Sequence, residues 1–532
     1  MRGEAIESSY PDIGSVYNVA NVIAKNATLS GLASKVAVVD ASKEGGSEYS
    51  YAQLNSRVNK LAHALLKLGV QQGDRVFVLL PNRVEILETL LACIKIGAIY
   101  TPANFRLSAE EIAFLMADVE PKTLIYDSDY GALVKDISER RDEAIPLVEV
   151  GAHNSDVAHY YDDFVKDMPE NDPNIITRPD DVCIILFTAG TTGRPKGVKL
   201  TNRGTFFACV ANGISAGLTR DDVYLGAPPM FHAGGITCFQ LYMLMVNGTI
   251  ILQSQLSPKE VLQLIKIYRV TFYFGIATQL KMTVEVDGWE LYVGSLKMVN
   301  GGGEAQPAEL KRAFIDRGIT YVSGYGLTET GATGLNWPAA ELDDPTLSRA
   351  SECIGKPPAF VEVKVLDESG NQVGAEETGE IVIRQEPTGA AGYWNRPEEE
   401  AKKFRDGWIF TGDLGKVDKD GFFYVLGRKD DMIISGGENI YPAEVERAIY
   451  AHPKVADAVV VKGKHPKWGQ TPKAIVVPKT GETITEEEIA GHVAKMLGSF
   501  KKPRQFVFLD SVPKSATGKV DKRTIKELYE EI

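Results

Sequence analysis

The sequence is poor in cysteine and has no long apolar run. Five cysteines are scattered over 532 residues, mostly within short apolar stretches. Their odd number and spacing predict buried free thiols in a reducing compartment, and argue against a disulfide framework or a metal cluster. No window approaches the roughly 18 uninterrupted apolar residues of a membrane span, and the first residues lack a secretory pattern. We therefore expect a cytoplasmic protein.

Basic residues are too few to balance the acidic ones. Lys and Arg number 58 against 71 Asp and Glu, which gives a formal net charge of -13. This charge disfavours a nucleic acid or an anionic membrane as a partner, because both need a basic face. An anionic substrate would have to be met by a local basic site. The length predicts two or more domains.

One stretch, residues 187–197, concentrates groups that bind phosphate. It follows the apolar run 182–186, which predicts a buried strand, and it holds three Gly, three Thr, one Lys and one Arg. Glycine lets backbone N–H groups approach a ligand, and the hydroxyls and cations add donors and positive charge. The stretch therefore predicts a polyphosphate loop, with a plain glycine-rich turn as the alternative. It is not a Walker motif, because Pro195-Lys196 stands where that motif needs Gly-Lys.

Alternating patterns predict a parallel sheet with helices on both faces. Strands are predicted at 74–80, 99–103 and 123–126, and helices at 50–68, 83–96 and from residue 108. Segment 128–179 is polar and weakly patterned, so we place it on the surface. Short strands at 361–367, 379–384 and 408–410 predict a barrel-like subdomain, and a compact α+β pattern begins at residue 442.

Five further motifs follow the loop in chain order. They are Asn300-Gly301-Gly302-Gly303-Glu304, Ser323 to Thr330, Thr411-Gly412-Asp413, Gly427 to Asn439, and Pro513 to Lys519. With the loop, they resemble the signatures of the adenylate-forming superfamily, from Tyr51 to Arg523. Its members are acyl- and aryl-CoA synthetases, adenylation domains of peptide synthetases, and luciferases. The pattern is most similar to that of acyl- or aryl-CoA ligases.

The resemblance implies an α/β fold in two parts. A large N-terminal AMP-binding domain, residues 1–427, would hold parallel-type sheets with helices on both faces and a β-barrel-like subdomain. A hinge at 428–430, with Asp430 as its pivot, would lead to a small mobile α+β lid domain at 431–532. Gly392-Tyr393-Trp394-Asn395 is a family landmark for which we predict a packing role.

The resemblance also implies that the chain uses ATP and Mg²⁺. Tyr325 would stack on adenine, and Thr328 would donate to the α-phosphate. Glu329 would hold Mg²⁺, which needs only one or two carboxylates besides phosphate oxygens and water. Asp413 would accept both ribose hydroxyls, and Arg428 would also meet the ribose. The other predicted nucleotide contacts are Thr188, Gly190, Thr191, Thr192, Gly193, Lys196, Gly302, Gly303, Glu304 and Gly326.

Lys519 and most of the coenzyme A contacts belong to the predicted small domain. In the family this lysine reaches into the cleft during adenylation, so we predict that Lys519 is catalytic together with Thr188 and Glu329. Gly436 and Gly437 match the segment that lines the thiol's approach. The remaining predicted CoA contacts are Arg106, Trp468, Phe500, Lys502 and Arg504. A solvated basic surface or tail is the alternative interpretation of the charged residues among them.

The acyl pocket is predicted beside His232. This histidine matches a family position that walls the pocket, and a satisfied core or surface histidine is the alternative. The small Ala233, Gly234 and Gly303 leave space for a chain or ring. No Asp stands nearby to bind an α-amino group, which argues against an amino acid substrate. Ala277 replaces a proline that is usual in the family.

These assignments predict an ATP-dependent carboxylic acid–CoA ligase. It would form an acyl-AMP intermediate and then an acyl-CoA thioester, on a fatty, cyclic or aromatic acid. The main alternative is an amino acid adenylation enzyme that loads a carrier protein. A luciferase-like oxygenase and a catalytically silent binding protein are further alternatives. The expected partners are the acid, ATP and CoA, without nucleic acid or integral membrane contact, and a homodimer is left open.

Overall fold

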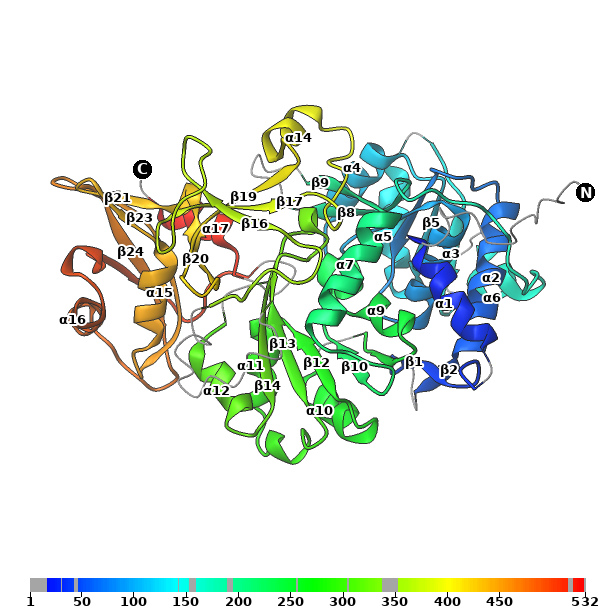
Figure 1. Cartoon of the computed structure of the whole chain (residues 1–532), viewed down its shortest axis with the longest axis horizontal. Coiled ribbons are helices and arrows are strands. Elements are labelled where there is room, and N and C mark those ends of the chain that lie inside the picture. The colour runs from blue at the N-terminus through cyan, green and yellow to red at the C-terminus, as the bar shows by residue number, and fades with distance from the viewer. Residues whose placement is uncertain are drawn as a thin grey trace, which may run out of the picture.

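The computed structural model describes residues 17–29, 31–42, 46–141, 143–152, 159–188, 195–254, 257–303, 306–336, 353–514 and 520–530. Two large, mostly parallel sheets and an antiparallel sheet form a large N-terminal domain, and a fourth sheet lies in a smaller C-terminal domain (Figure 1). The predicted α/β fold class is therefore confirmed. None of the described helices combines the length and the apolar character that crossing a membrane requires.

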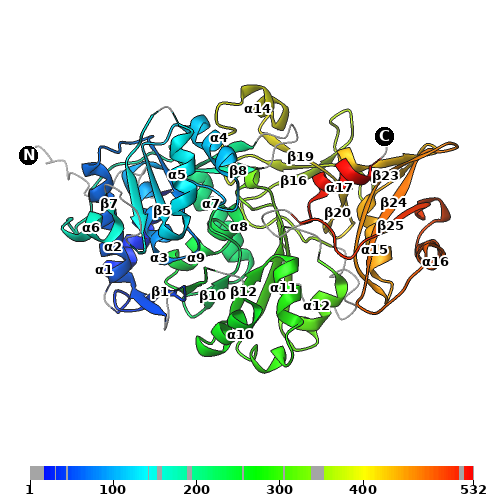
Figure 2. The same cartoon turned by 180° about the vertical axis from the view of Figure 1, so that it is seen from behind.

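The first sheet has the strand order β7-β6-β5-β3-β4-β8-β9. Its strands are β3 Arg75–Leu79, β4 Ile99–Pro102, β5 Thr123–Asp127, β6 Leu147–Val150, β7 His159–Tyr160, β8 Val182–Thr188 and β9 Lys196–Thr201. Neighbours run parallel except β8 and β9. Helices α4 (Ala109–Val119) and α5 (Gly131–Glu139) cover one face, with Ile112 and Ile137 in the same cluster as Phe77 (Figure 2). This alternation is the one that the strand and helix patterns predicted.

The placement of segment 128–179 wholly on the surface was wrong. Helix α5 buries Val134 and Ile137, and strands β6 and β7 extend the first sheet, with Val148 fully buried. Strands of four and two residues are too short to show a reliable period, so the pattern did not reveal them.

The second sheet has the order β15-β14-β13-β12-β10-β11-β1-β2. Its strands are β1 Val36–Asp40, β2 Ser47–Ser50, β10 Val223–Gly226, β11 Thr249–Leu252, β12 Phe272–Gly275, β13 Met298–Gly302, β14 Thr320–Tyr325 and β15 Leu335–Asn336. The pairs are parallel except at the two edges, where β2 and β15 run antiparallel. The carboxyl ends of a parallel sheet are where α/β proteins bind ligands, and β13 and β14 end at the predicted nucleotide motifs.

Helices connect the strands and pack against the faces of the two sheets. They are α1 Val19–Thr28, α2 Tyr51–Lys67, α3 Val84–Ile96, α4 Ala109–Val119, α5 Gly131–Glu139, α6 Tyr161–Lys166, α7 Asn202–Ser215, α8 Ala233–Ile236, α9 Gln240–Met245, α10 Pro258–Ile267, α11 Ala277–Val284 and α12 Ala308–Ile315. All 13 residues of α3 are buried. One hydrophobic cluster contains residues of α3 and of both sheets, including Val76 and Tyr224, so the two sheets share a core.

An antiparallel sheet lies beyond the carboxyl ends of β13 and β14 (Figure 1). It comprises β16 Val363–Leu366, β17 Gly379–Arg384, β18 Phe404–Arg405, β19 Trp408–Val417 and β20 Phe423–Arg428, with helix α14 Pro397–Lys403 beside it. Strand β19 runs seven residues beyond the predicted 408–410, because its pairing with β20 continues to Val417. Asp413 is therefore a strand residue, paired with Arg428.

The fourth sheet has the order β22-β21-β24-β23, and β25 pairs with β24. Its strands are β21 Ile433–Ser435, β22 Glu438–Ile440, β23 Val455–His465, β24 Gly469–Pro478 and β25 Gln505–Phe508, accompanied by α15 Pro442–Tyr450, α16 Glu486–Met496 and α17 Lys522–Tyr529. Val445 of α15 and Ile489 of α16 pack in one cluster, and Ile525 of α17 packs in another. This sheet thus has its own core on both faces.

Candidate active site

The structure joins Asp413 to two other predicted nucleotide residues. The Tyr325 hydroxyl donates to Asp413 Oδ2 at 2.5 Å, and Arg428 Nη1 donates to Asp413 Oδ1 at 3.1 Å. Asp413 is buried, with 7% of the residue exposed. Burial raises the pKa of Tyr325 well above its usual value, and the neighbouring Asp413 raises it further. Tyr325 therefore stays a hydroxyl donor, and the three side chains form one connected group at the ends of β14 and β20 and the middle of β19.

The second predicted carboxylate, Glu329, is held by a tyrosine. Glu329 lies in the short helix η4, Thr328–Thr330, and is 9% exposed. The Tyr393 hydroxyl donates to Glu329 Oε1 at 2.6 Å. Burial and the Glu329 charge both raise the pKa of Tyr393. Tyr393 is packed, as the landmark motif predicted, but it also orients a site carboxylate, and sequence reasoning missed that role.

The landmark motif, residues 392–395, also supports the base of the predicted polyphosphate loop at residues 187–197. Trp394 N donates to Gly197 O at 2.7 Å, and Lys199 N donates to Gly392 O at 2.9 Å. The Lys196 ammonium lies 5.3 Å from the centre of the Tyr393 ring, an attractive arrangement for a cation. The motif thus runs beside β9 and links Lys196 to Glu329 through one aromatic ring.

The loop joins β8 and β9, whose ends pair Thr188 with Lys196. Gly190, Thr191, Thr192 and Gly193 lie outside the described residues, as do Glu304 and Lys519. The described ends show a hairpin closed at its base, which suits both a phosphate loop and a simple turn. The loop's role remains a prediction.

The glycine motif at residues 300–304 begins within β13, and Tyr325 ends the neighbouring strand β14. Strands β13 and β14 pair Gly302 with Gly324, and Gly303 has a φ of +80°, a conformation that favours glycine. Gly326 has a packing reason of its own, because an added Cβ would come within 2.7 Å of the Ala332 backbone. Gly326 is therefore needed by the turn itself.

One predicted acyl-pocket residue, Gly234, lies beside Phe274. His232 precedes α8, and Ala233 within that helix is buried. A Cβ added at Gly234 would lie 3.6 Å from the Phe274 ring, and one at Gly302 would lie 3.5 Å from it. Both distances are ordinary van der Waals contacts, so a methyl group would fit against the ring at either position. The structure thus places α8 and the end of β13 against Phe274 of β12.

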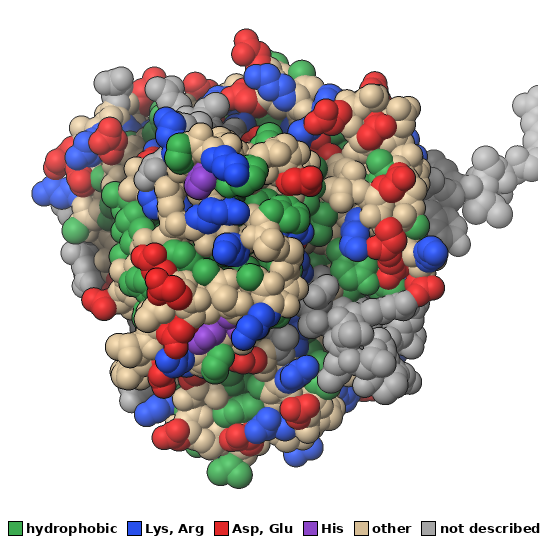
Figure 3. Space-filling view, turned by 90° about the vertical axis from the view of Figure 1, so that its left-hand side faces the viewer, with side chains coloured by type: hydrophobic (Ala, Val, Ile, Leu, Met, Phe, Trp, Pro, Cys, Tyr) green, Lys and Arg blue, Asp and Glu red, His purple; other side chains and the backbone are tan. Residues whose placement is uncertain are grey.

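The predicted CoA residues of the small domain form an aromatic and basic surface. Figure 3 shows Lys and Arg side chains among hydrophobic ones on this end of the molecule. Trp468 and Phe500 are each 37% exposed, with the ammonium groups of Lys467 and Lys501 over their rings. The remaining predicted contacts are the partly buried Lys502 and Arg504, and Arg106, which is exposed in the large domain with its guanidinium 5.5 Å from the Phe105 ring.

Gly436 has a structural reason to be glycine. Its φ is +64°, its N–H donates to Trp468 O at 2.9 Å, and an added Cβ would come within 2.6 Å of the Trp468 ring. Gly437 also has a positive φ, of +89°. The two glycines thus form a tight turn beneath Trp468.

Asp430 lies between the two domains' sheets, in the short helix η6, Lys429–Asp431. The Lys462 ammonium donates to the Asp430 backbone oxygen at 2.7 Å from the small domain's side. Lys429 forms an ion pair of 3.7 Å with Glu380 of the antiparallel sheet. The Asp430 side chain is exposed, so its packing does not hold the segment between the two domains in place.

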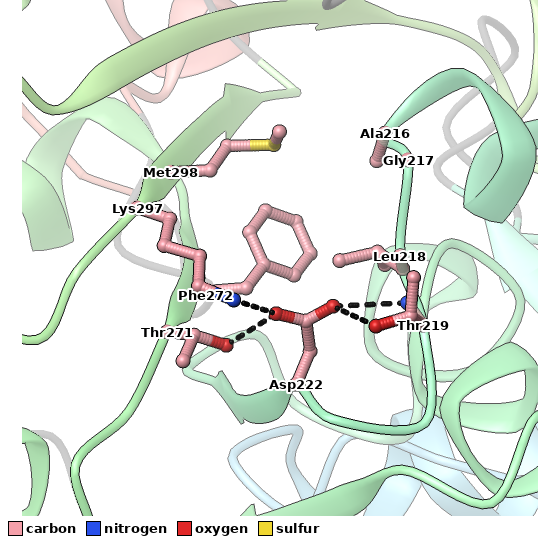
Figure 4. Close-up of a pocket in the computed structure, with 9 residues that line it drawn as sticks. All are labelled: Ala216, Gly217, Leu218, Thr219, Asp222, Thr271, Phe272, Lys297 and Met298. Atoms are coloured by element: carbon pink, nitrogen blue, oxygen red, sulfur yellow. Dashed lines mark hydrogen bonds and ion pairs between the residues drawn. The ribbon is translucent and has the colours of Figure 1, made fainter.

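A separate cavity of about 160 Å³ lies at the opposite, amino ends of β10, β12 and β13 (Figure 4). Asp222 within it accepts from Thr219 at 2.9 Å, from Thr271 at 2.9 Å and from Lys297 at 3.1 Å. Burial by itself would raise the pKa of Asp222, but these bonds outweigh it and lower the pKa. The Asp222 carboxylate thus links the segments that precede β10, β12 and β13.

Known proteins share both halves of this arrangement. Residues 26–394 match the family described as AMP-binding enzyme, and residues 444–519 match the AMP-binding enzyme C-terminal domain. A feruloyl-CoA synthase from Amycolatopsis sp. is 37% identical over 490 residues, covering 92% of this chain and 96% of that protein.

Solved structures agree over the whole chain. The anthranilate CoA ligase AuaEII in complex with anthranoyl-AMP superimposes with a TM-score of 0.88 at 25% identity, covering 97% of each chain. ATP-bound MatB from Rhodopseudomonas palustris gives a TM-score of 0.86 at 28% identity, covering 96% of this chain and 99% of MatB. The sequence match and the fold match agree, and Asp413 and Glu329 are each bonded to a tyrosine where the motifs predicted a site. This chain therefore belongs to the AMP-binding enzyme family.

Proposed function

We propose that this enzyme is an ATP-dependent carboxylic acid–CoA ligase that acts on an aromatic acid. One observation carries the proposal: two buried carboxylates, Asp413 and Glu329, are each held by a tyrosine hydroxyl beside the ends of β13 and β14. Such a pair suits a nucleotide, with its ribose at Asp413 and its phosphates toward Glu329. The relatives named as CoA ligases support the same reaction.

In the first step the substrate carboxylate would attack the α-phosphorus of ATP and release pyrophosphate. Both reactants are anions, so repulsion and orientation make up much of the barrier. Lys196, Thr188 and Lys519 are the groups that we assign to neutralise and position them, with Thr328 donating to the α-phosphate. Two unit charges about 4 Å apart interact by about 4 kcal/mol at an effective dielectric near 20, against about 1 kcal/mol in water. Excluding water from the site therefore matters for this step.

The described residues fit a Mg²⁺ ion that takes most of its ligands from the nucleotide's phosphates and from water. None of the described His, Cys, Asp and Glu side chains form a group of three or more that could hold a metal. Glu329 is a single buried carboxylate, and Mg²⁺ is commonly held by one or two carboxylates with phosphate oxygens and water. Glu329 would hold such an ion, which would supply charge neutralisation on the phosphates.

In the second step the CoA thiol would attack the acyl-adenylate carbonyl and release AMP. A lysine that fills the cleft for adenylation would obstruct this approach. We therefore propose domains at 1–427 and 431–532 with a hinge at 428–430, which would present Lys519 first and Gly436-Gly437 with the Trp468 surface afterwards. The two domains' separate cores support this division.

An aromatic acid is the substrate class that the relatives favour, because they are named as a feruloyl-CoA synthase and an anthranilate CoA ligase. Gly234 and Gly302 leave room for a methyl-sized group against the ring of Phe274, which is itself buried. A panel of ferulate, anthranilate, a medium-chain fatty acid and phenylalanine tests the proposal by pyrophosphate release and CoA thioester formation. We expect the highest kcat/KM for an aromatic acid. Turnover of phenylalanine without a CoA thioester would instead support amino acid adenylation.

Replacing Tyr393 by Phe should weaken the magnesium site. The change removes the hydroxyl that fixes Glu329 Oε1 and leaves the ring that faces Lys196. Loss of such a supporting bond typically costs about 10- to 100-fold in metal affinity or activity. We expect the Mg²⁺ concentration for half-maximal pyrophosphate release to rise about 10-fold. Tyr424→Phe, which removes a hydroxyl bonded to Asp418, is the control. An unchanged Mg²⁺ dependence in Tyr393→Phe would refute the role.

A further inference from the structure

Lys403 directs its ammonium into the group of residues around Asp413. It is the last residue of α14, in a run of three Glu, one Ala and two Lys that reads from sequence as a solvated helix. Its neighbour Lys402 is indeed exposed, whereas Lys403 is partly buried and its Nζ donates to Thr411 O at 3.0 Å. Nothing in the local sequence distinguishes the two lysines, so only the fold separates them.

A second cation binds the same oxygen. Arg428 Nη1 donates to Thr411 O at 2.9 Å and to Asp413 Oδ1 at 3.1 Å. Two like charges on one carbonyl repel each other, and an anion placed between them would relieve this repulsion. Burial lowers the pKa of Lys403; Glu329, Asp413 and Glu380 oppose this effect, and Arg428 adds to it.

Lys403 is also tied to the Glu329 side of the site. Phe404, the next residue, packs edge-on against Tyr393 with ring centres 5.5 Å apart. Tyr393 in turn donates to Glu329. The ammonium is also close enough to both carboxylates, the one that we assign to the ribose and the one that we assign to the metal-bound phosphates, for each to raise the pKa of Lys403.

The covalent structure of a nucleotide indicates which of its groups would lie near both carboxylates. The α-phosphate is joined to the ribose on one side and to the remaining phosphates, or the acyl group, on the other. We propose that Lys403 binds the α-phosphate of the bound nucleotide, in ATP and in the acyl-adenylate alike. This inference rests on the proposed function. Because Lys403 and Asp413 both belong to the antiparallel sheet region, its charge would remain in place when the small domain turns.

The test compares AMP with adenosine, which differ only by the phosphate. Binding of each is measured by calorimetry at pH 7.5 to the full-length wild type, Lys403→Met, Lys403→Arg and the control Lys402→Met. Loss of a charge-assisted hydrogen bond predicts about 10- to 100-fold weaker AMP binding to Lys403→Met. Adenosine affinity should stay within about twofold of wild type in every variant. Lys403→Arg should retain most of the AMP affinity, and Lys402→Met all of it.

Two results would overturn the inference. Equal losses for AMP and adenosine would show that Lys403 only positions Asp413, and unchanged AMP binding would show that the ammonium does not reach the phosphate. A wild type that binds neither ligand would refute the proposed function itself. A thermal melt of each variant separates these outcomes from unfolding.

The pH dependence of AMP binding gives a second readout. The ammonium faces Glu329, Asp413, Glu380 and Arg428, and the pKa of Lys403 lies below the ordinary value of 10.5. AMP affinity of the wild type should therefore fall as the pH rises from 7.5 toward 10.5, because the neutral amine no longer attracts the phosphate. Lys403→Arg, which keeps its charge, should show a smaller fall. Identical profiles would contradict phosphate binding by Lys403.

Discussion

Replacing Lys519 by Ala is expected to slow acyl-adenylate formation by about 100- to 1000-fold, the usual effect of removing a group that stabilises developing charge. The substrate carboxylate and the α-phosphate repel each other, and in our mechanism this ammonium is brought between them. Thioester formation from supplied acyl-AMP should remain within a few-fold of wild type, because that step does not use Lys519. Pyrophosphate release and CoA thioester formation, measured separately by single turnover, check both halves.

Lys514→Ala is the matched control for this experiment. Lys514 is an exposed lysine five residues earlier in the same motif, so its loss removes an equal charge from the same part of the chain. It should leave both half-reactions close to wild type. If Lys519→Ala slowed the two half-reactions equally, the lysine would have no step-specific role and the proposed alternation would be wrong.

Replacing Asp430 by Pro is expected to do the reverse. Proline fixes φ near -65°, removes an N–H and restricts the residue before it, so the connection between β20 and β21 would lose the freedom to turn. Adenylation should continue, and thioester formation should fall by on the order of 100-fold, because misplacement of reacting groups by even 1 Å can cost that much. The measurement is the rate of each half-reaction in a single turnover.

Asp430→Ala separates the backbone effect from the side chain. The Asp430 side chain is exposed and its backbone oxygen accepts from Lys462, a bond that Ala preserves. This variant should therefore keep both rates. Normal thioester formation by Asp430→Pro would place the hinge elsewhere, and a parallel loss in Asp430→Ala would assign the effect to the carboxylate.

The local sequence pattern was sufficient to predict features that depend on residues near one another in the chain. Helix α2 begins at Tyr51 and is capped by Ser50, where the sequence predicted its start; the Ser50 hydroxyl accepts from Gln53 N while Gln53 Oε1 accepts from Ser50 N. Helix α3 ends at Gly97, with a φ of +73°, as its sequence indicated. The five cysteines are free and buried, as their apolar surroundings predicted. The two helix ends depend on residues that are close together in the chain, and the apolar runs around the cysteines are likewise local signals.

Sequence by itself thus determined the α/β alternation, the order of the motifs and the candidate residues Asp413, Glu329 and Arg428. Tertiary structure decided what these residues contact: Tyr393 lies 64 positions from the Glu329 that it holds. It also separated Lys403 from the exposed Lys402, and buried β6 within a segment that looks polar. A hydrogen bond or a buried charge depends on neighbours in space, and a local pattern records only neighbours along the chain.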